Sequence, residues 1–180
     1  MPSNNIIPTT KYWLDKTIIE FNFCPFAKKE FVNYSIHYEV VDDSNTEEQL
    51  LAFAHELKRL DDHPEIETTL FILSKGLESF FDYLDFLQLA TDLSVELGYE
   101  GKYQLASFHP DYCFEGSNQA DTENYTNRSP FPMIHIIREA SLERVLKHYP
   151  EPENIPIKNM ALARESGAEV FQKTLKKSTL

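Results

Sequence analysis

The segment Thr68–Leu73 constrains the fold of this chain more than any other feature of its sequence. Its residues are apolar in both of the sets that alternate along a strand, so neither side of it suits exposure to water. Such a run is typical of a central strand that is covered on both faces. We therefore predict a sheet that is built around this segment, with helices packed against it.

Three more strands are predicted, at residues 34–41, 102–108 and 133–138. In the first of these, apolar residues alternate with polar ones, which is typical of a strand with one wet side, and His37 falls on that side as a surface residue. Segments with a helical spacing of apolar residues separate the strands. Two of these segments lie at residues 10–21 and 26–31. A third starts at a capping pattern at 44–47 and ends at 61–64, and three more lie at 79–97, 141–148 and 156–176.

The element order is α-β-α-β-α-β-loop-β-α, which predicts the α/β class and a mixed sheet of about four strands with packed helices; α+β is the alternative. A chain of 180 residues has the usual size of one domain. We expect a single globular domain over residues 1–180, with a flexible N-terminal segment at 1–8. The last helix is expected to be continuous, after an extended connection that contains three prolines.

Charge and composition limit the class of partner. The chain has 29 acidic and 17 basic side chains, for a formal net charge of -12. Nucleic acids and anionic membranes attract basic surfaces, so we expect neither as a partner. There is no basic start followed by an apolar run, as in a signal peptide, and no apolar run of the roughly 20 residues that span a bilayer, so a cytoplasmic location is expected. Two cysteines are too few for a disulfide scaffold.

The long connection at residues 109–132 is the leading candidate for a functional site. Connections beyond roughly 12–15 residues are usually functional or disordered, and the aromatic residues in this one argue against disorder. It leaves the expected carboxyl end of a strand, where ligands of open α/β sheets bind. The connection offers His109 for proton transfer, Asp111 and Asp121 as carboxylates, Arg128 as an anion-binding fork, and Asn124, Tyr125 and Asn127 to orient a polar ligand.

Each of these residues also has a structural interpretation. His109 equally fits a histidine that binds backbone at the end of a strand, and Arg128 equally fits an ion pair with Asp121 or with Glu123. Asn124 and Asn127 are favourable turn residues without any ligand. Sequence reasoning alone leaves these alternatives open.

A second histidine, His135, lies between Ile134 and Ile136 in the fourth predicted strand. That setting favours a histidine in the core or at an interface. If the third and fourth strands pair, His109 and His135 would approach one another. Metal binding through His109 and Asp111 is a weak possibility, because the spacing matches no established ligand pattern, and we predict no metal site.

Cys24 has two opposed interpretations. It precedes Pro25, a residue that favours the first helical position, and amide groups at a helix start lower the pKa of a thiol. The aromatic residues Phe21, Phe23 and Phe26 indicate instead a small buried hydrophobe, whose pKa burial raises. We favour the second interpretation.

Several of these residues fall in motifs that occur in a fixed order. The motifs are Phe23-Cys24-Pro25-Phe26-Ala27, Ala106-Ser107-Phe108-His109-Pro110, Asn124-Tyr125-Thr126-Asn127-Arg128-Ser129-Pro130 and His135-Ile136-Ile137-Arg138-Glu139. On them the chain resembles, from Trp13 to the last helix, an uncharacterised bacterial family catalogued as domain of unknown function fourteen-fifteen. The resemblance implies that Cys24, His109, Arg128, His135 and Arg138 are family motif residues; it implies no activity and no cofactor.

Three hypotheses about function follow. The first is a small enzyme that acts on a phosphate- or carboxylate-bearing metabolite, with Arg128 and Arg138 as the anion clamp and His109 as acid or base, oriented by Asp111 or Asp121. The second is a non-catalytic ligand-binding or protein-interaction domain that uses the aromatic residues of the 109–132 connection. The third is thiol redox chemistry at Cys24. The catalytic candidates are therefore His109, Asp121, His135 and Cys24, and the ligand-binding candidates are Arg128, Asn124, Tyr125, Asn127 and Arg138; cofactor and oligomeric state stay open.

Overall fold

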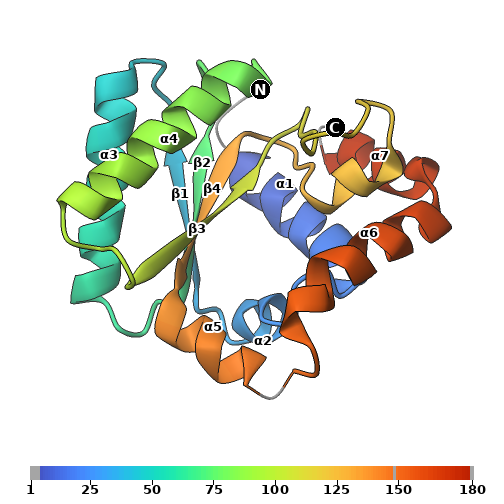
Figure 1. Cartoon of the computed structure of the whole chain (residues 1–180). Coiled ribbons are helices and arrows are strands. Elements are labelled where there is room, and N and C mark those ends of the chain that lie inside the picture. The colour runs from blue at the N-terminus through green and yellow to red at the C-terminus, as the bar shows by residue number, and fades with distance from the viewer. Residues whose placement is uncertain (1–4, 148, 179–180) are drawn as a thin grey trace.

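In the computed structural model, which describes residues 5–147 and 149–178, the chain forms a mixed four-stranded sheet with helices on both faces (Figure 1). The strands are β1 (Ile36–Val41), β2 (Thr68–Leu73), β3 (Tyr103–Phe108) and β4 (Met133–Arg138). The α/β class and the four predicted strands are confirmed. The first strand begins at Ile36 and not at residue 34, since Tyr34 has a φ of 57° and so lies in the left-handed region.

The strand β2 lies inside the sheet. The strand order is β1-β2-β4-β3, with β1 parallel to β2 and β4 antiparallel to both of its neighbours. All six residues of β2 are buried, as its continuous apolar run predicts. The edges of the sheet are formed by β1 and β3.

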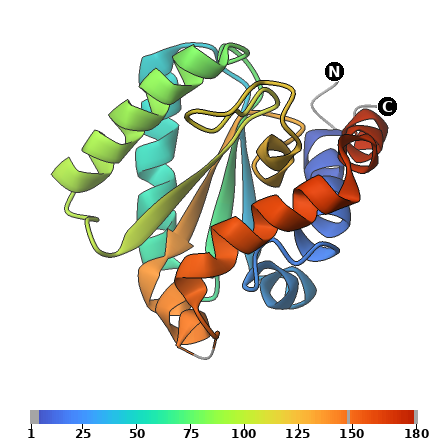
Figure 2. The same cartoon turned by 45° about the vertical axis from the view of Figure 1, so that its right-hand side comes forward.

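Helices cover both faces of this sheet. The helical elements are α1 (Ile6–Trp13), the π-helical η2 (Leu14–Ile19), α2 (Ala27–Val32), α3 (Thr46–Asp62), α4 (Phe80–Glu96), the 3-10 helix η3 (Thr122–Thr126), α5 (Glu139–Leu146), the 3-10 helix η4 (Pro152–Asn154), α6 (Ile155–Ser166) and α7 (Ala168–Ser178). One face is covered by α3 and α4, whereas α1, α6 and α7 lie on the other side (Figures 1 and 2). None of the helices in the described ranges is long and apolar enough to cross a bilayer.

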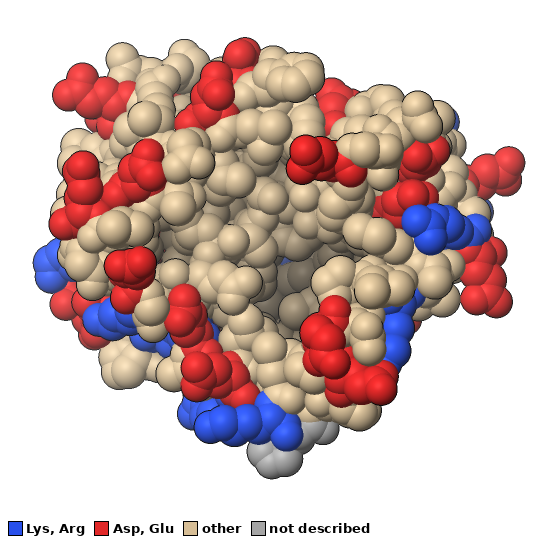
Figure 3. All heavy atoms as spheres, viewed as in Figure 1, with Lys and Arg blue, Asp and Glu red and all other residues tan. Residues whose placement is uncertain are grey.

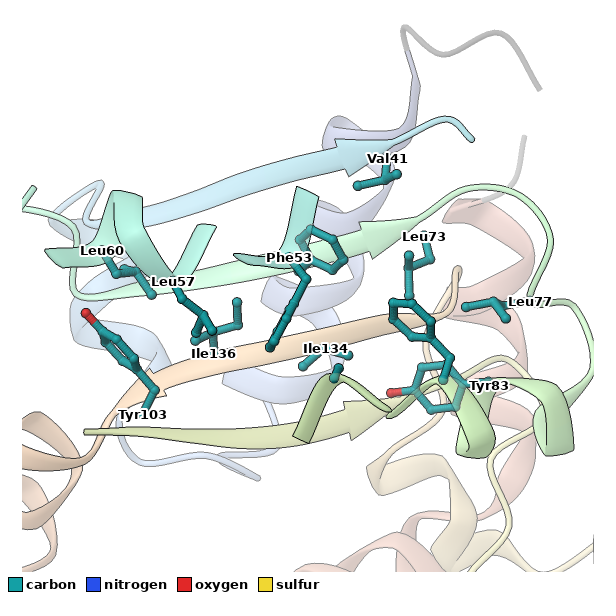
Figure 4. Packing of buried hydrophobic residues seen from close by; sticks show 13 residues of the cluster. Val41, Phe53, Leu57, Leu60, Leu73, Leu77, Tyr83, Tyr103, Ile134 and Ile136 are labelled. Atoms are coloured by element: carbon teal, nitrogen blue, oxygen red, sulfur yellow. The ribbon is translucent and has the colours of Figure 1, made fainter. Parts of the chain in front are cut away.

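The face under α3 and α4 is a close-packed apolar core. Phe53 and Leu57 from α3 and Tyr83 from α4 point toward Ile134 and Ile136 on β4 (Figure 4). Both helices begin at side-chain caps: the cap of α3 is Asn45, one residue after the start of the capping pattern at 44–47, and the cap of α4 is Ser79. The side chain of Asn45 accepts hydrogen bonds from two backbone N–H groups of the first turn of α3, and that of Ser79 accepts one in α4.

The predicted start of the first helix was wrong. The first helix begins at Ile6 and not at residue 10, and Ile6 is buried in the apolar cluster that includes Phe171 of α7. Residues 6–8 therefore belong to a helix that packs against the other end of the chain, and Pro8 is tolerated because it falls in the first turn. Residues 1–4 of the segment expected to be flexible lie outside the described residues.

The C-terminal third also differs from expectation. Helix α5 begins at Glu139, and Ser141 is not its cap, because the Ser141 hydroxyl donates to Glu67 instead. The expected helix at 156–176 is two helices, since Gly167 has a φ of 81° and breaks it. The connection before them is not extended but forms η4. Residue 148, the expected end of the preceding helix, lies outside the described residues.

Candidate functional site

A cavity of about 400 Å³ lies between the sheet and the N-terminal helices, α5 and α6. The space-filling view shows a hollow in this face of the molecule (Figure 3). Its floor consists of alternate residues from all four strands, because the pleat turns every second side chain toward it. These residues are Ile36 from β1, Thr68 and Leu70 from β2, His135 and Ile137 from β4, and Gln104, Ala106 and Phe108 from β3.

The walls of the cavity are mainly apolar. Leu14 and Ile18 come from η2, and π-helical turns are frequent at functional sites. Phe114 from the 109–132 connection and Met160 from α6 close other sides. Among the described lining residues the single acidic or basic side chain is Glu30, which accepts a hydrogen bond from Ser35 at 2.5 Å and pairs with Lys29 at 3.3 Å.

His135 is the histidine that the sheet holds in the floor of this cavity, together with the polar side chains of Thr68 and Gln104. On the neighbouring strands it is flanked by Leu70 and Ala106. Its Nε2 lies 2.7 Å from the hydroxyl oxygen of Thr68, and that hydroxyl donates to the backbone carbonyl of Ile136 at 2.6 Å. A hydroxyl has one proton to donate, so the Thr68 oxygen accepts from the Nε2–H of His135. The ring is thereby held in one tautomer, with its lone pair on Nδ1, and within the described part of the chain Nδ1 has no hydrogen-bond partner.

The imidazole of His135 is neutral at physiological pH. Burial lowers its pKa from the usual 6.5 to about 4, because the apolar surroundings disfavour the charged form. The cavity therefore presents a neutral hydrogen-bond acceptor to whatever enters it.

Cys24 lies on the wall of the same cavity, in the turn before α2. Its thiol is free. Burial raises the pKa of this thiol, and the backbone N–H groups of Phe26 and Ala27 act in the opposite direction but less strongly. Both interpretations drawn from the sequence thus describe a real influence, and the effect of burial is the larger one.

His109 lies on the opposite face of the sheet from His135. Its ring packs against Phe80 and Tyr83 of α4, at centroid distances of 5.3 and 5.2 Å. Its Nε2 donates to the carbonyl of Leu77, and its Nδ1 accepts from the backbone N–H of Asp111, each at 3.0 Å. Both nitrogens are thus engaged by backbone, and burial lowers the pKa of the ring. The expected approach of His109 to His135 was wrong, because the pleat turns them to opposite faces.

Arg128 is held by the connection in which it lies. Its Nε donates to the carbonyl of Tyr112 at 3.1 Å and its Nη2 to that of Gln119 at 2.6 Å, while the guanidinium lies 4.7 Å from the centre of the Tyr125 ring. It pairs with neither of the carboxylates considered from the sequence, since Glu123 pairs with Arg164. These contacts indicate that Arg128 organises the connection.

The other polar residues of the connection also bind its backbone. Asn124 accepts from the N–H of Phe114 and donates to the carbonyl of Asn118, and Asp121 accepts from the N–H of Asn118 at 2.8 Å. Tyr125 stacks on Phe171 with centroids 5.6 Å apart. Neither Asp111 nor Asp121 forms an ion pair with His109. Among the described residues, the group of side chains that could hold a metal ion lies elsewhere, at His37, Glu39 and Glu56.

Arg138 fastens the sheet to the end of α3. Its Nε donates to the carbonyl of Ile66 at 2.9 Å, and its Nη2 contacts the carbonyls of Leu60 and His63. It therefore does not flank the cavity as an anion clamp. Asn127 does line the cavity, with its amide donating to the carbonyl of Ser107 at 3.1 Å.

Three of the residues singled out in the sequence, Cys24, Asn127 and His135, thus meet at one cavity. Sequence reasoning missed Thr68, which sets the tautomer of His135. The available signal was a hydroxyl residue at the start of a strand that is otherwise apolar on both sides.

The chain belongs to a family of unknown function. A family model described as "Protein of unknown function (DUF1415)" matches residues 5–173, in agreement with the resemblance seen in the sequence motifs. Comparison with the curated proteins and with the solved structures found no significant match.

Proposed function

We propose that this member of a family of unknown function binds a small, uncharged and mainly apolar molecule in the cavity, and that Nδ1 of His135 accepts a hydrogen bond from it. The observation that carries the proposal is the unpaired nitrogen of a neutral imidazole at the floor of a cavity of about 400 Å³. This acceptor belongs to the cavity lining and is not a buried atom without a partner. A ligand that donates a hydrogen bond to it would gain about 0.5–1.5 kcal/mol.

The charge of the cavity supports an uncharged ligand. The described lining residues include the carboxylate of Glu30 and no lysine or arginine. An anion that enters an apolar site without a cationic partner loses its hydration and gains little in return. The lining thus supports neither a phosphate- nor a carboxylate-bearing metabolite, which the enzyme hypothesis from the sequence assumed. The volume suits a compact metabolite, since pockets for drug-sized ligands run to roughly 300–1,000 Å³.

Catalysis by Cys24 is the second candidate, favoured by the observation that its thiol shares the cavity with His135. In such a reaction the sulfur would add to a carbonyl carbon of the ligand: the C–S bond forms, the C=O π pair moves to the oxygen, and the thiol proton passes by way of Nδ1 to that oxygen. A base is most effective when its pKa is near the working pH, and that of His135 is about 4. Binding is therefore the primary proposal, and catalysis requires the ligand to raise that pKa.

We place this function in the cytoplasm, where reducing conditions suit the two free thiols, Cys24 and Cys113. The net charge of -12 supports a small molecule, and not a nucleic acid or an anionic membrane, as the partner. Acidic side chains outnumber basic ones over the face that contains the hollow (Figure 3).

The test uses three probes of similar size: phenol, toluene and benzoate. We expect phenol to raise the melting temperature most, because it combines an apolar ring with a donor for Nδ1. Toluene should stabilise less, and benzoate should not stabilise the protein. The variant His135→Phe keeps a ring but removes the acceptor, so phenol and toluene should become equivalent. His55→Phe is the matched control at an exposed histidine and should behave as wild type.

Two results would contradict the proposal. One is the absence of any stabilisation by phenol or toluene. The other is a preference for phenol over toluene that persists in folded His135→Phe. A further variant, Ala106→Leu, leaves His135 in place and fills the cavity from β3. It should abolish the response to both neutral probes.

A further inference from the structure

A second group of chemically active side chains lies on the other face of the sheet, away from the cavity. His37 and Glu39 are on the edge strand β1, and Glu56 is on α3, which packs over that strand. The pleat turns His37 and Glu39 to the same face, because they are two residues apart. One ring nitrogen and two carboxylate oxygens from these residues lie within 4.8 Å of one another.

We propose that His37, Glu39 and Glu56 form a binding site for a divalent transition metal ion, with Zn²⁺ as the metal that the ligand set fits best. Imidazole together with carboxylate oxygen is a donor set that zinc accepts, whereas Mg²⁺ and Ca²⁺ prefer oxygen alone. The proposal is independent of the ligand proposed for the cavity, since the two sites share no residue.

The spacing of the donor atoms carries the proposal. Nε2 of His37 lies 3.3 Å from Oε2 of Glu39 and 3.6 Å from Oε2 of Glu56. Zinc bonds to nitrogen and oxygen are about 2.0–2.1 Å long, so the ligand atoms of a tetrahedral site are about 3.3–3.4 Å apart. The two distances from Nε2 of His37 are therefore close to those of a zinc site, and the two carboxylate oxygens lie within 4.8 Å of one another.

The buried carboxylate of Glu56 supports the metal site independently of the spacing of the donor atoms. This side chain is 1% exposed, and its Oε1 is held by Nε of Arg59. Its Oε2 is held less tightly, since the Thr69 hydroxyl lies 3.5 Å away and Nε2 of His37 lies 3.6 Å away. Both are at or beyond the outer limit of a hydrogen bond. A buried carboxylate oxygen thus points into the cluster with a weak set of partners.

The local charge also favours a cation. With a neutral imidazole, the two carboxylates and Arg59 carry a formal charge of -1. Arg59 contacts Oε1 of Glu56 closely and lies 3.9 Å from Oε2 of Glu39, so this single cation offsets one of the two carboxylates and leaves the other for the metal. The side chains of His37 and Glu39 are 29% and 32% exposed, which leaves room for water as the fourth ligand.

The alternative is a proton in place of the metal, with charged His37 paired to both carboxylates. Calorimetric titration of the metal-free full-length protein with ZnCl₂ at neutral pH separates the two. The metal site predicts one equivalent of Zn²⁺ bound, with an affinity that falls in acid because protons compete with the metal for its ligands. His37→Gln and Glu39→Gln should each weaken binding at least about tenfold.

Two control variants address other zinc ligands. His63→Gln removes a similar but exposed histidine–glutamate pair, and Cys24→Ala removes the thiol of the cavity. Both should bind Zn²⁺ as wild type does. The proposal is overturned if wild type binds no zinc, if the two glutamine variants of the site bind it unchanged, or if a control variant loses it equally. Should a site variant fail to fold, the histidine resonances of wild type decide, because Zn²⁺ must shift those of His37 first.

Discussion

The two faces of the sheet bury similar side chains, but one face forms a packed core and the other surrounds a cavity. Under α3 and α4, residues such as Phe53 and Phe71 form a buried apolar cluster, with their rings 5.6 Å apart in an edge-to-face arrangement. On the other face, Trp13, Ile18 and their neighbours surround a cavity of about 400 Å³. Close packing is the default for a protein interior. The cavity on the other face departs from this default, and that departure is what motivates the proposed ligand site.

Two histidines, His109 just after β3 and His135 within β4, show the same contrast. His109 and His135 are both buried enough to have a lowered pKa. Backbone groups engage both nitrogens of His109, whereas Thr68 engages one nitrogen of His135. Burial of a histidine alone therefore does not indicate a site. The informative property is hydrogen-bonding capacity that the fold leaves unused.

The largest difference between the faces is expected for matched truncations of phenylalanine. Phe53→Ala should cost about 3–5 kcal/mol of unfolding free energy, because it opens a new hole in a packed core. Phe114→Ala enlarges a cavity that already exists and removes a half-buried side chain, so we expect a loss of less than about 1.5 kcal/mol. Urea unfolding of both variants measures this. Equal losses would mean that the two faces are packed alike in solution.

A second, smaller difference is expected between the two histidines. His109→Leu leaves the buried carbonyl of Leu77 and the N–H of Asp111 without their partner and should cost about 2–3 kcal/mol. In His135→Leu the Thr68 hydroxyl keeps its bond to Ile136, so stability should stay within about 1 kcal/mol of wild type or rise. Thermal and urea unfolding of the pair measure this. A larger loss for His135→Leu than for His109→Leu would reverse the assignment of structural and functional histidine.

The sheet could be predicted from sequence because its signals are local. The run Thr68–Leu73 has no wet side, and its observed bounds agree with the prediction. Caps at Asn45 and Ser79 are likewise local signals. The start of the first helix could not be predicted in this way. Ile6 is ordered by packing in a cluster with α7, at the other end of the chain.

The candidate site was harder to predict, for a physical reason. A long connection has no strand or helix ladder to satisfy its backbone, so polar side chains do so instead. Arg128 and Asn124 bind carbonyl and N–H groups of their own connection, and in sequence such residues look the same as ligand-binding ones. His135 has isoleucine neighbours, and its defining partner, Thr68, is far away along the chain. The sequence alone does not show that Thr68 and His135 are in contact.

The pH dependence of stability isolates His135 and is the smallest effect of the three. Its folded pKa of about 4 lies below its unfolded value of about 6.5, so the unfolded chain binds the proton more readily between these values. The contribution of this group is fully present above about pH 6.5 and is lost as the pH falls toward 4. Between about pH 7.5 and about pH 5, wild type should lose roughly 2 kcal/mol more than His135→Leu.

In the difference between wild type and this variant, the pH-dependent contributions of His109 and the carboxylates to the free energy of unfolding cancel, because both proteins contain these groups. Urea unfolding at the two pH values gives the difference directly. A matching loss in both proteins would mean that the ring of His135 takes up a proton as easily as it does in water. The floor of the cavity would then be hydrated, its histidine would be charged in mild acid, and the preference for an uncharged, apolar ligand would lose its physical basis.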